Sequence, residues 1–301
     1  MNGIVILDKP GGISSNQAQA RLKRLLGQDK MGFLGTLDPL ATGVLPVFVG
    51  KATKLIAAFE GAEKSYRVTI RLGQRTDTLD SEGKLLEERP LDGIDAERVR
   101  AAILSFAGGY RQRVPEYAAV KIGGVPAYRL ARRGEPVPER ERDVKLWDLA
   151  VESVELPHAV FRADCSAGTY MRSLASDIGT VLGVGAHVAA LRRLRCGPLF
   201  TLENSITLAE IEERTANGDF AMVRNPAEFL TGHFPLTVGE DSERFLREGR
   251  AIPLNAAVDR QQARIGAPAK ALRPGGTLVA VGEIVSGGPD ALSFHPSKVL
   301  I

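Results

Sequence analysis

One carboxylate, Asp38, lies in a loop whose composition could hold it rigidly. The segment GFLGTLDPLATG, residues 32–43, is rich in Gly and Pro. Pro39 disfavours the helical region for Asp38, and the glycines allow the backbone to approach a ligand closely. A carboxylate fixed in this way can act as a nucleophile. For an isolated Asp-Pro pair, an Asx-turn or a helix cap is the alternative interpretation.

Two further candidate residues are expected on regular elements. Apolar and polar residues alternate over 66–72, which predicts a half-buried strand with Tyr66 facing the core. A second strand, over about 160–165, leads through Ser-Ala-Gly-Thr into a helix. The apolar stripe of that helix is Met171, Leu174, Ala175, Ile178, Val181 and Leu182. Arg172 lies on the flank of this stripe, where residue type alone favours a solvated side chain.

The remaining segments indicate a mixed fold. The apolar run over 3–7 predicts a buried strand, and Ser14 and Ser15 can cap a helix that ends near Leu26. Residues 123–145 have mixed charge and no strong period, which suggests a partly helical excursion from the sheet. After residue 235, short strand candidates with one helix over about 241–248 indicate a small β-rich domain.

Composition narrows the class of protein. The 301 residues are 44% hydrophobic and 25% charged, with a net charge of +3, so a nucleic-acid surface would need local clusters of charge. Cys165 and Cys196 lack metal-ligand spacing, and we expect no metal site. No secretion signal or transmembrane segment is evident. We expect a cytoplasmic protein without membrane contact, and nothing in the sequence favours an oligomer over a monomer.

Four blocks of the chain resemble one family. Residues 32–46 are similar to the catalytic loop of the TruB family of tRNA pseudouridine synthases, whose pattern is G-x-x-G-x-L-D-P-x-A-x-G-x-L-P. Three more blocks resemble the family in the same order: KSYRVTIRLGQRTDTLDSEG at 64–83, PEYAAVKIGGVPAYRLAR at 115–132 and CSAGTYMRSLASDIGTVLGVGAHVAALRRL at 165–194. The closing HPSKVL is more weakly similar to the PUA-like tail of bacterial members.

The resemblance implies a fold and a reaction. The fold would be α/β (α+β), with a mixed, largely antiparallel sheet flanked by helices. Residues 1–235 would form the catalytic domain, with a tRNA-gripping insertion at about 110–145, and residues 236–301 a PUA-like RNA-binding domain. The reaction would isomerise a uridine at tRNA position 55, in the T-loop. Since no atom is gained or lost, no cofactor is implied.

The resemblance also implies roles for single residues. Asp38 matches the catalytic Asp, and Arg172 the arginine that pairs with it and keeps it ionised in a dry pocket. Tyr66 matches the tyrosine that stacks on the flipped base. Tyr170 and Leu191 match positions that line the pocket; Leu191 would otherwise be a core residue of a helix.

The tRNA T arm is the implied partner. By resemblance, its phosphates would contact basic residues at Arg129, Arg132, Arg133, Arg192 and Arg193. Taken alone, such mixed-charge runs are usually solvated surface. Phe33 departs from the family, many members of which have His there; Phe33 keeps an aromatic ring but has no hydrogen-bond donor.

Three alternatives remain at this point. A tRNA-binding chaperone would use the same groove without chemistry. A guide-RNA-dependent relative would share the loop but depend on partner proteins and lack the long insertion. A retaining glycosidase would need two carboxylates about 5 Å apart, and the blocks supply one obvious candidate.

Overall fold

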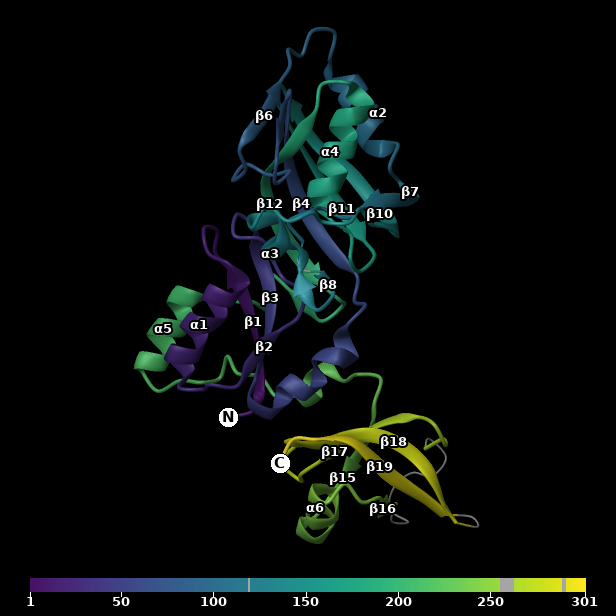
Figure 1. The fold of residues 1–301 in the computed structure, drawn as a ribbon. Helices are drawn as coiled ribbons and strands as arrows, with labels where there is room; N and C mark the ends of the chain where they lie inside the picture. Colours follow the sequence, from purple (N-terminus) through teal and green to yellow (C-terminus); the bar gives the residue numbers. More distant parts are fainter. Residues whose placement is uncertain (119, 255–262, 289–290) are drawn as a thin grey trace.

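A computed structural model describes residues 1–118, 120–254, 263–288 and 291–301 of the chain. The larger body combines one mixed sheet with helices, and a smaller β-rich body follows it toward the C-terminus (Figure 1). The prediction of a mixed α/β fold with a β-rich C-terminal part is therefore confirmed.

The large sheet supplies the framework of the first body. Among the described residues it has ten strands, with β14-β1-β3-β12-β4-β11-β10-β7 as its main path. The strands are β1 (Gly3–Lys9), β2 (Met31–Phe33), β3 (Thr42–Val49), β4 (Lys64–Leu72), β7 (Gly108–Arg113), β10 (Glu141–Glu155), β11 (His158–Cys165), β12 (Ala186–Cys196), β13 (Phe200–Thr201) and β14 (Ile206–Thr207). Only the β1–β14 and β3–β12 pairs are parallel, so the sheet is largely antiparallel, as expected.

Helices cover this sheet and its edge. They are α1 (Ser15–Leu26), α2 (Ala96–Leu104), α3 (Ala127–Arg132), α4 (Met171–Leu182) and α5 (Leu208–Ala216), with 3-10 helices η1 (Gly50–Phe59) and η2 (Pro226–Phe229). The helices α2 and α4 lie together beside β10 and β12, while α1 packs against α5 (Figure 1). The predicted stripe of α4 is buried at Met171, Leu174, Ala175 and Ile178, but Val181 in the last turn is 61% exposed.

Strand β12 corrects one expectation. Leu191, interpreted from the sequence as a helix residue, lies in β12, which pairs with β4 along most of its length. Val68 and Tyr66 stand opposite Leu191 and Arg193 in the register. Because alternate residues of a strand share a face, these four side chains lie on one side of the sheet.

The two ends of the predicted insertion, about 110–145, overlap strands of the large sheet. Strands β7 and β10, which include its two ends, pair with each other within the large sheet. The excursion therefore spans residues 114–140. It holds the hairpin β8 (Lys121–Ile122) and β9 (Val125–Pro126), followed by α3. A second hairpin, β5 (Gln74–Thr76) and β6 (Leu85–Glu88), follows β4.

The C-terminal body has its own sheet and shares a core with the first body. Its elements are β15 (Phe234–Thr237), α6 (Glu240–Arg247), β16 (Ile252–Pro253), β17 (Pro268–Leu272), β18 (Leu278–Gly288) and β19 (Ala291–Val299), with sheet order β15-β17-β18-β19-β16. Leu278, Val281 and Leu300 pack in one apolar cluster with Ile4 and Phe48 of the large sheet. The two bodies are thus joined by buried apolar contact as well as by the chain.

Among the described residues, no helix combines the length and the apolar character that crossing a membrane requires.

Candidate active site

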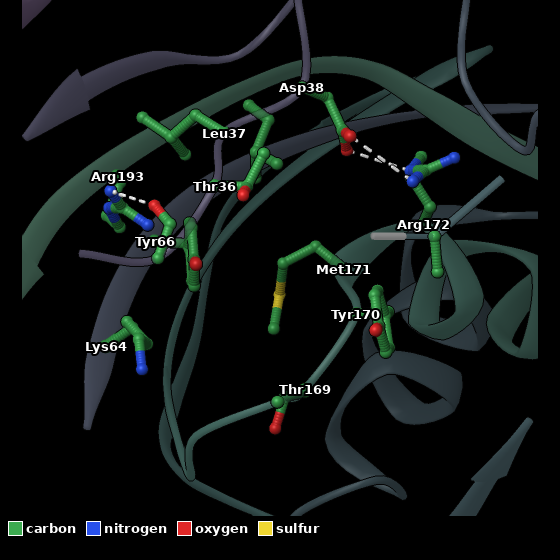
Figure 2. A pocket seen from close by; sticks show the side chains of 14 residues that line it. Thr36, Leu37, Asp38, Lys64, Tyr66, Thr169, Tyr170, Met171, Arg172 and Arg193 are labelled. Carbon is green, nitrogen blue, oxygen red and sulfur yellow. Dashed lines mark hydrogen bonds and ion pairs between the residues drawn. The ribbon is translucent and has the colours of Figure 1, made fainter. Parts of the chain in front are cut away.

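A cavity of about 230 Å³ opens beside the loop that carries Asp38 (Figure 2). It is lined by all five residues predicted for the catalytic and base-binding site: Asp38, Tyr66, Tyr170, Arg172 and Leu191. Their elements are far apart in the sequence, and the sheet brings them together. Lys64, Met171 and Arg193 also line the cavity.

Hydrogen bonds from buried Ser15 and within the loop itself hold the backbone around Asp38. The Ser15 hydroxyl, at the start of α1, accepts from the Leu37 amide and donates to the Leu37 carbonyl, both at 2.9 Å. The Asp38 carbonyl accepts from the Ala41 amide at 3.1 Å, which closes a tight turn. With the Leu37 backbone and the Asp38 carbonyl fixed in this way, the Asp38 carboxyl has a defined position.

Lys9 supports the same loop and was missed as a functional residue. Its buried Nζ donates to the carbonyls of Pro10, Ile13 and Pro39, at 2.8, 2.6 and 3.3 Å. Burial lowers the pKa of Lys9 to about 8, although the nearby Asp38 carboxylate favours its charged form. A lysine at the end of a buried strand was the available signal.

Arg172 pairs with Asp38 through two nitrogens. Its Nε lies 2.9 Å from Asp38 Oδ2, and its Nη2 donates to Asp38 Oδ1 at 3.3 Å (Figure 2). The other donors reach the carbonyls of Thr78 and Tyr117, both at 2.9 Å. Arg172 is therefore 5% exposed, in contrast to the solvated side chain that its helix-flank position favours.

Burial raises the pKa of the Asp38 carboxyl above its usual value. The Arg172 guanidinium opposes this rise, and the charge of Asp80 adds to it. The buried Asp80 carboxylate lies 3.8 Å from Arg172 Nε and accepts from the Thr78 hydroxyl at 2.6 Å. One guanidinium thus serves two carboxylates. Asp80 was not among the predicted site residues; its place in the Thr-Asp-Thr-x-Asp loop at 76–80 was the available signal.

Gln112 positions the start of α4. Tyr170 precedes this helix and provides no side-chain cap. The Gln112 amide, fully buried in β7, accepts from the Tyr170 amide at 2.8 Å and donates to the Tyr170 carbonyl at 3.0 Å. This pair of bonds fixes the backbone from which the Tyr170 and Arg172 side chains project.

Arg193 differs from its predicted role. It was expected to contact RNA phosphates, but it is 1% exposed, and its guanidinium donates to the carbonyls of Val44 and Gly35 at 2.6 and 2.9 Å. It also donates to the Tyr66 hydroxyl (Figure 2). Strand pairing directs this side chain into the cavity wall, so it braces the Asp38 loop and Tyr66. Burial raises the pKa of Tyr66 to about 12.

The other predicted RNA contacts are on the surface. Arg129 and Arg132 lie in α3, and Arg133 follows it; all three are exposed. Arg132 lines a second hollow that reaches Asp38 from the side of α1, and its guanidinium lies 5.8 Å from the Tyr128 ring centre. Arg192 is partly exposed and pairs with both oxygens of Asp8 at 3.1 and 2.6 Å.

Phe33 and the cysteines lie outside this arrangement. Phe33 is half-buried in β2 and packs against the main core. Cys165 and Cys196 are buried and free, and burial raises the pKa of Cys165 to about 11. Among the described residues, no group of three or more His, Cys, Asp or Glu side chains could hold a metal ion.

The chain matches two family models. Residues 23–171 match the N-terminal domain of TruB family pseudouridylate synthases, and residues 172–224 match the tRNA pseudouridylate synthase B C-terminal domain. The first match contains the Asp38 loop and β4, and the second begins at Arg172.

Relatives and solved structures agree with these matches. The chain is 42% identical over 297 residues to tRNA pseudouridine synthase B of Thermobifida fusca, covering 95% of this chain and 96% of the relative. It is 43% identical over 257 residues to that of Burkholderia lata, covering 85% and 79%. A chain of a Cbf5-Nop10-Gar1 complex has a TM-score of 0.68 at 26% identity, covering 99% and 85%. The chain is therefore a member of the TruB family of pseudouridylate synthases.

Proposed function

We propose that this protein isomerises uridine to pseudouridine at position 55, in the T-loop of tRNA, with Asp38 as the nucleophile. The observation that carries the proposal is the Asp38–Arg172 pair at one wall of a cavity whose other wall holds Tyr66. The names of the relatives, tRNA pseudouridine synthase B, support tRNA as the substrate.

The reaction needs an ionised carboxylate in a dry pocket. The N1–C1' bond breaks, the base turns, and a C5–C1' bond forms. Arg172 opposes the effect of burial on Asp38, so that the carboxylate can attack as an anion. The base must be flipped out of the T-loop, at a cost of a few kcal/mol. Stacking on Tyr66 offsets part of that cost, on the order of 1–3 kcal/mol.

The surface arginines supply the tRNA contacts in this proposal. Arg129, Arg132 and Arg133 lie on the excursion, where they can reach the phosphates of the T arm. Residues 1–235 form the catalytic domain, and residues 236–301 a PUA-like domain that adds RNA contacts. The protein acts as a monomer in the cytoplasm.

Tritium release tests the proposal. Purified protein is incubated with an unmodified tRNA transcript carrying tritium at C5 of uridine, because forming the C5–C1' bond expels that hydrogen. Wild type should release the label from one uridine, at position 55. Asp38→Asn should bind the transcript and release none. Unchanged release from Asp38→Asn would show that another group is the nucleophile, while binding without release by wild type would favour a tRNA chaperone.

A further inference from the structure

Lys64 occupies the base cavity at the end away from Asp38. It begins β4, two residues before Tyr66, so both side chains lie on the same face of the strand. Figure 2 shows Lys64 on the wall that carries Tyr66, with Asp38 and Arg172 across the cavity. A Cβ built on Gly35 would stand 3.2 Å from Arg193 Nη1 and 3.8 Å from Lys64 Cε, so the backbone of the Asp38 loop lies directly against both side chains at this glycine.

The Lys64 ammonium has little compensation from the protein. Its Nζ donates to the Ala62 carbonyl, and in the described part of the chain it forms no salt bridge with a carboxylate. Its strand neighbours are Cys165 on one side and Cys196 on the other, and the guanidinium of Arg193 lies near. Burial lowers the pKa of Lys64, which means that this surrounding disfavours its charge. A half-buried ammonium with spare donors is costly unless something else accepts from it.

The proposed reaction creates such an acceptor. When the N1–C1' bond breaks, its electron pair remains on N1 and is delocalised onto the carbonyl oxygens O2 and O4. If Asp38 attacks C6 first, the electrons of the C5–C6 double bond move toward O4. On either route, uracil carbonyl oxygens gain negative charge while the base lies in the cavity.

We propose that Lys64 is a further catalytic residue, whose ammonium donates a hydrogen bond to a uracil carbonyl oxygen and stabilises this negative charge. The proposal rests on the function proposed above. Lys64 transfers no proton: the electron pair returns as C5 bonds to C1', the bond from Asp38 to C1' or C6 breaks and restores the carboxylate, C5 loses its proton to water, and N1 takes one from water. A fixed donor aimed at a developing oxyanion lowers the barrier because the donor needs no reorganisation.

The symmetry of uracil explains how one donor can serve both ends of the reaction. Its two carbonyls flank N3, so turning the base about the N3–C6 axis brings O4 to the place that O2 held. A donor placed at that position therefore meets a carbonyl oxygen before and after the turn. Cytosine, with an amino group at C4, would place a donor against Lys64 in one of the two orientations.

The test uses Lys64→Ala with chemical rescue. Single-turnover tritium release, at saturating protein, measures the chemical step, and filter binding measures tRNA affinity. Lys64→Ala should lose about 10²–10³-fold in rate, as for a single oxyanion donor, and keep its affinity within about threefold. Added ethylammonium should restore part of the rate because it offers N–H donors. Tetramethylammonium, which has none, and propanol, which fills space without charge, should not.

The controls distinguish failure of the proposed role of Lys64 from failure of the proposed isomerase function. Lys30→Ala makes the same change at an exposed lysine and should behave as wild type. Absence of release by wild type would overturn the proposed function, whatever Lys64 does. If wild type is active, three results would overturn the role of Lys64. They are a rate for Lys64→Ala within about threefold of wild type, a loss in Lys64→Ala that is confined to tRNA affinity, and equal rescue of Lys64→Ala by ethylammonium and tetramethylammonium. If Lys64→Ala does not fold, Lys64→Arg decides: it should retain most of the rate, and a loss as large as that of a missing donor would overturn the role.

Discussion

Arg172→Lys should separate positive charge from geometry at the centre of the site. The substitution keeps a cation beside Asp38 but replaces a planar fork with a single ammonium. The fork of Arg172 contacts both oxygens of Asp38 and two backbone carbonyls, those of Thr78 and Tyr117. The single ammonium of a lysine cannot donate at once to all of these acceptors, because they lie in different directions around the guanidinium.

The expected magnitude follows from the contacts that are lost. Losing one of two hydrogen bonds to the Asp38 carboxylate removes about 1.5–3 kcal/mol, because one partner is charged. If this loss acts on the transition state, the rate should fall about 10- to 150-fold. At least one of the two carbonyls loses its donor as well, at about 1–3 kcal/mol of folding stability.

Single-turnover tritium release and thermal unfolding measure the two effects. Arg224→Lys is a matched control, because Arg224 forms a two-nitrogen pair with Glu228 on the surface. The control should keep the wild-type rate. A rate for Arg172→Lys within about twofold of wild type would refute the reasoning, because charge alone would then be sufficient.

Three further outcomes follow from the same geometry. The rate of wild type should fall as the pH falls through the raised pKa of Asp38, because the nucleophile is then protonated. Ionising a carboxyl whose pKa is raised by folding costs folding stability above that pKa, so Asp38→Asn, though inactive, should unfold at no lower temperature than wild type. A clearly lower unfolding temperature for Asp38→Asn would contradict this. Gly43→Ala should lower the unfolding temperature much more than Gly61→Ala, because both glycines have positive φ but only at Gly43 would a Cβ meet backbone, at 2.1 Å; equal losses in calorimetry would argue against the steric cause. Arg132→Ala should weaken tRNA binding and reduce the slope of log affinity against log salt by about one, whereas an unchanged slope would exclude a phosphate contact.

The local sequence was sufficient to predict the position of a side chain where that position depends on neighbours in the chain. The alternation over 66–72 placed Tyr66 on the inner face of a strand, as observed. The Gly- and Pro-rich loop around Asp38, together with its resemblance to one family, placed the carboxylate in the cavity.

Secondary structure and burial were harder to predict for residues that contact elements distant in the sequence. The alanine-rich segment before Leu191 has the composition of a helix, yet pairing with β4 makes it a strand. The same pairing buries Arg193, which belongs to a basic run that suggested a surface. The depth of Arg172 depends on Asp38, on Asp80 and on two carbonyls from separate loops.

The apolar cluster between the two bodies constrains how the protein can be cut or recombined. Deleting the chain after residue 235 would remove Leu278, Val281 and Leu300 from the apolar cluster that they share with Ile4, Phe48 and Leu55, and would expose part of that cluster to water. Such a truncated protein would tend to self-associate. A chimera that takes this segment from a relative should fold stably only when the residues on both sides of the apolar cluster come from the same protein. The C-terminal part therefore contributes to an interior that both bodies share.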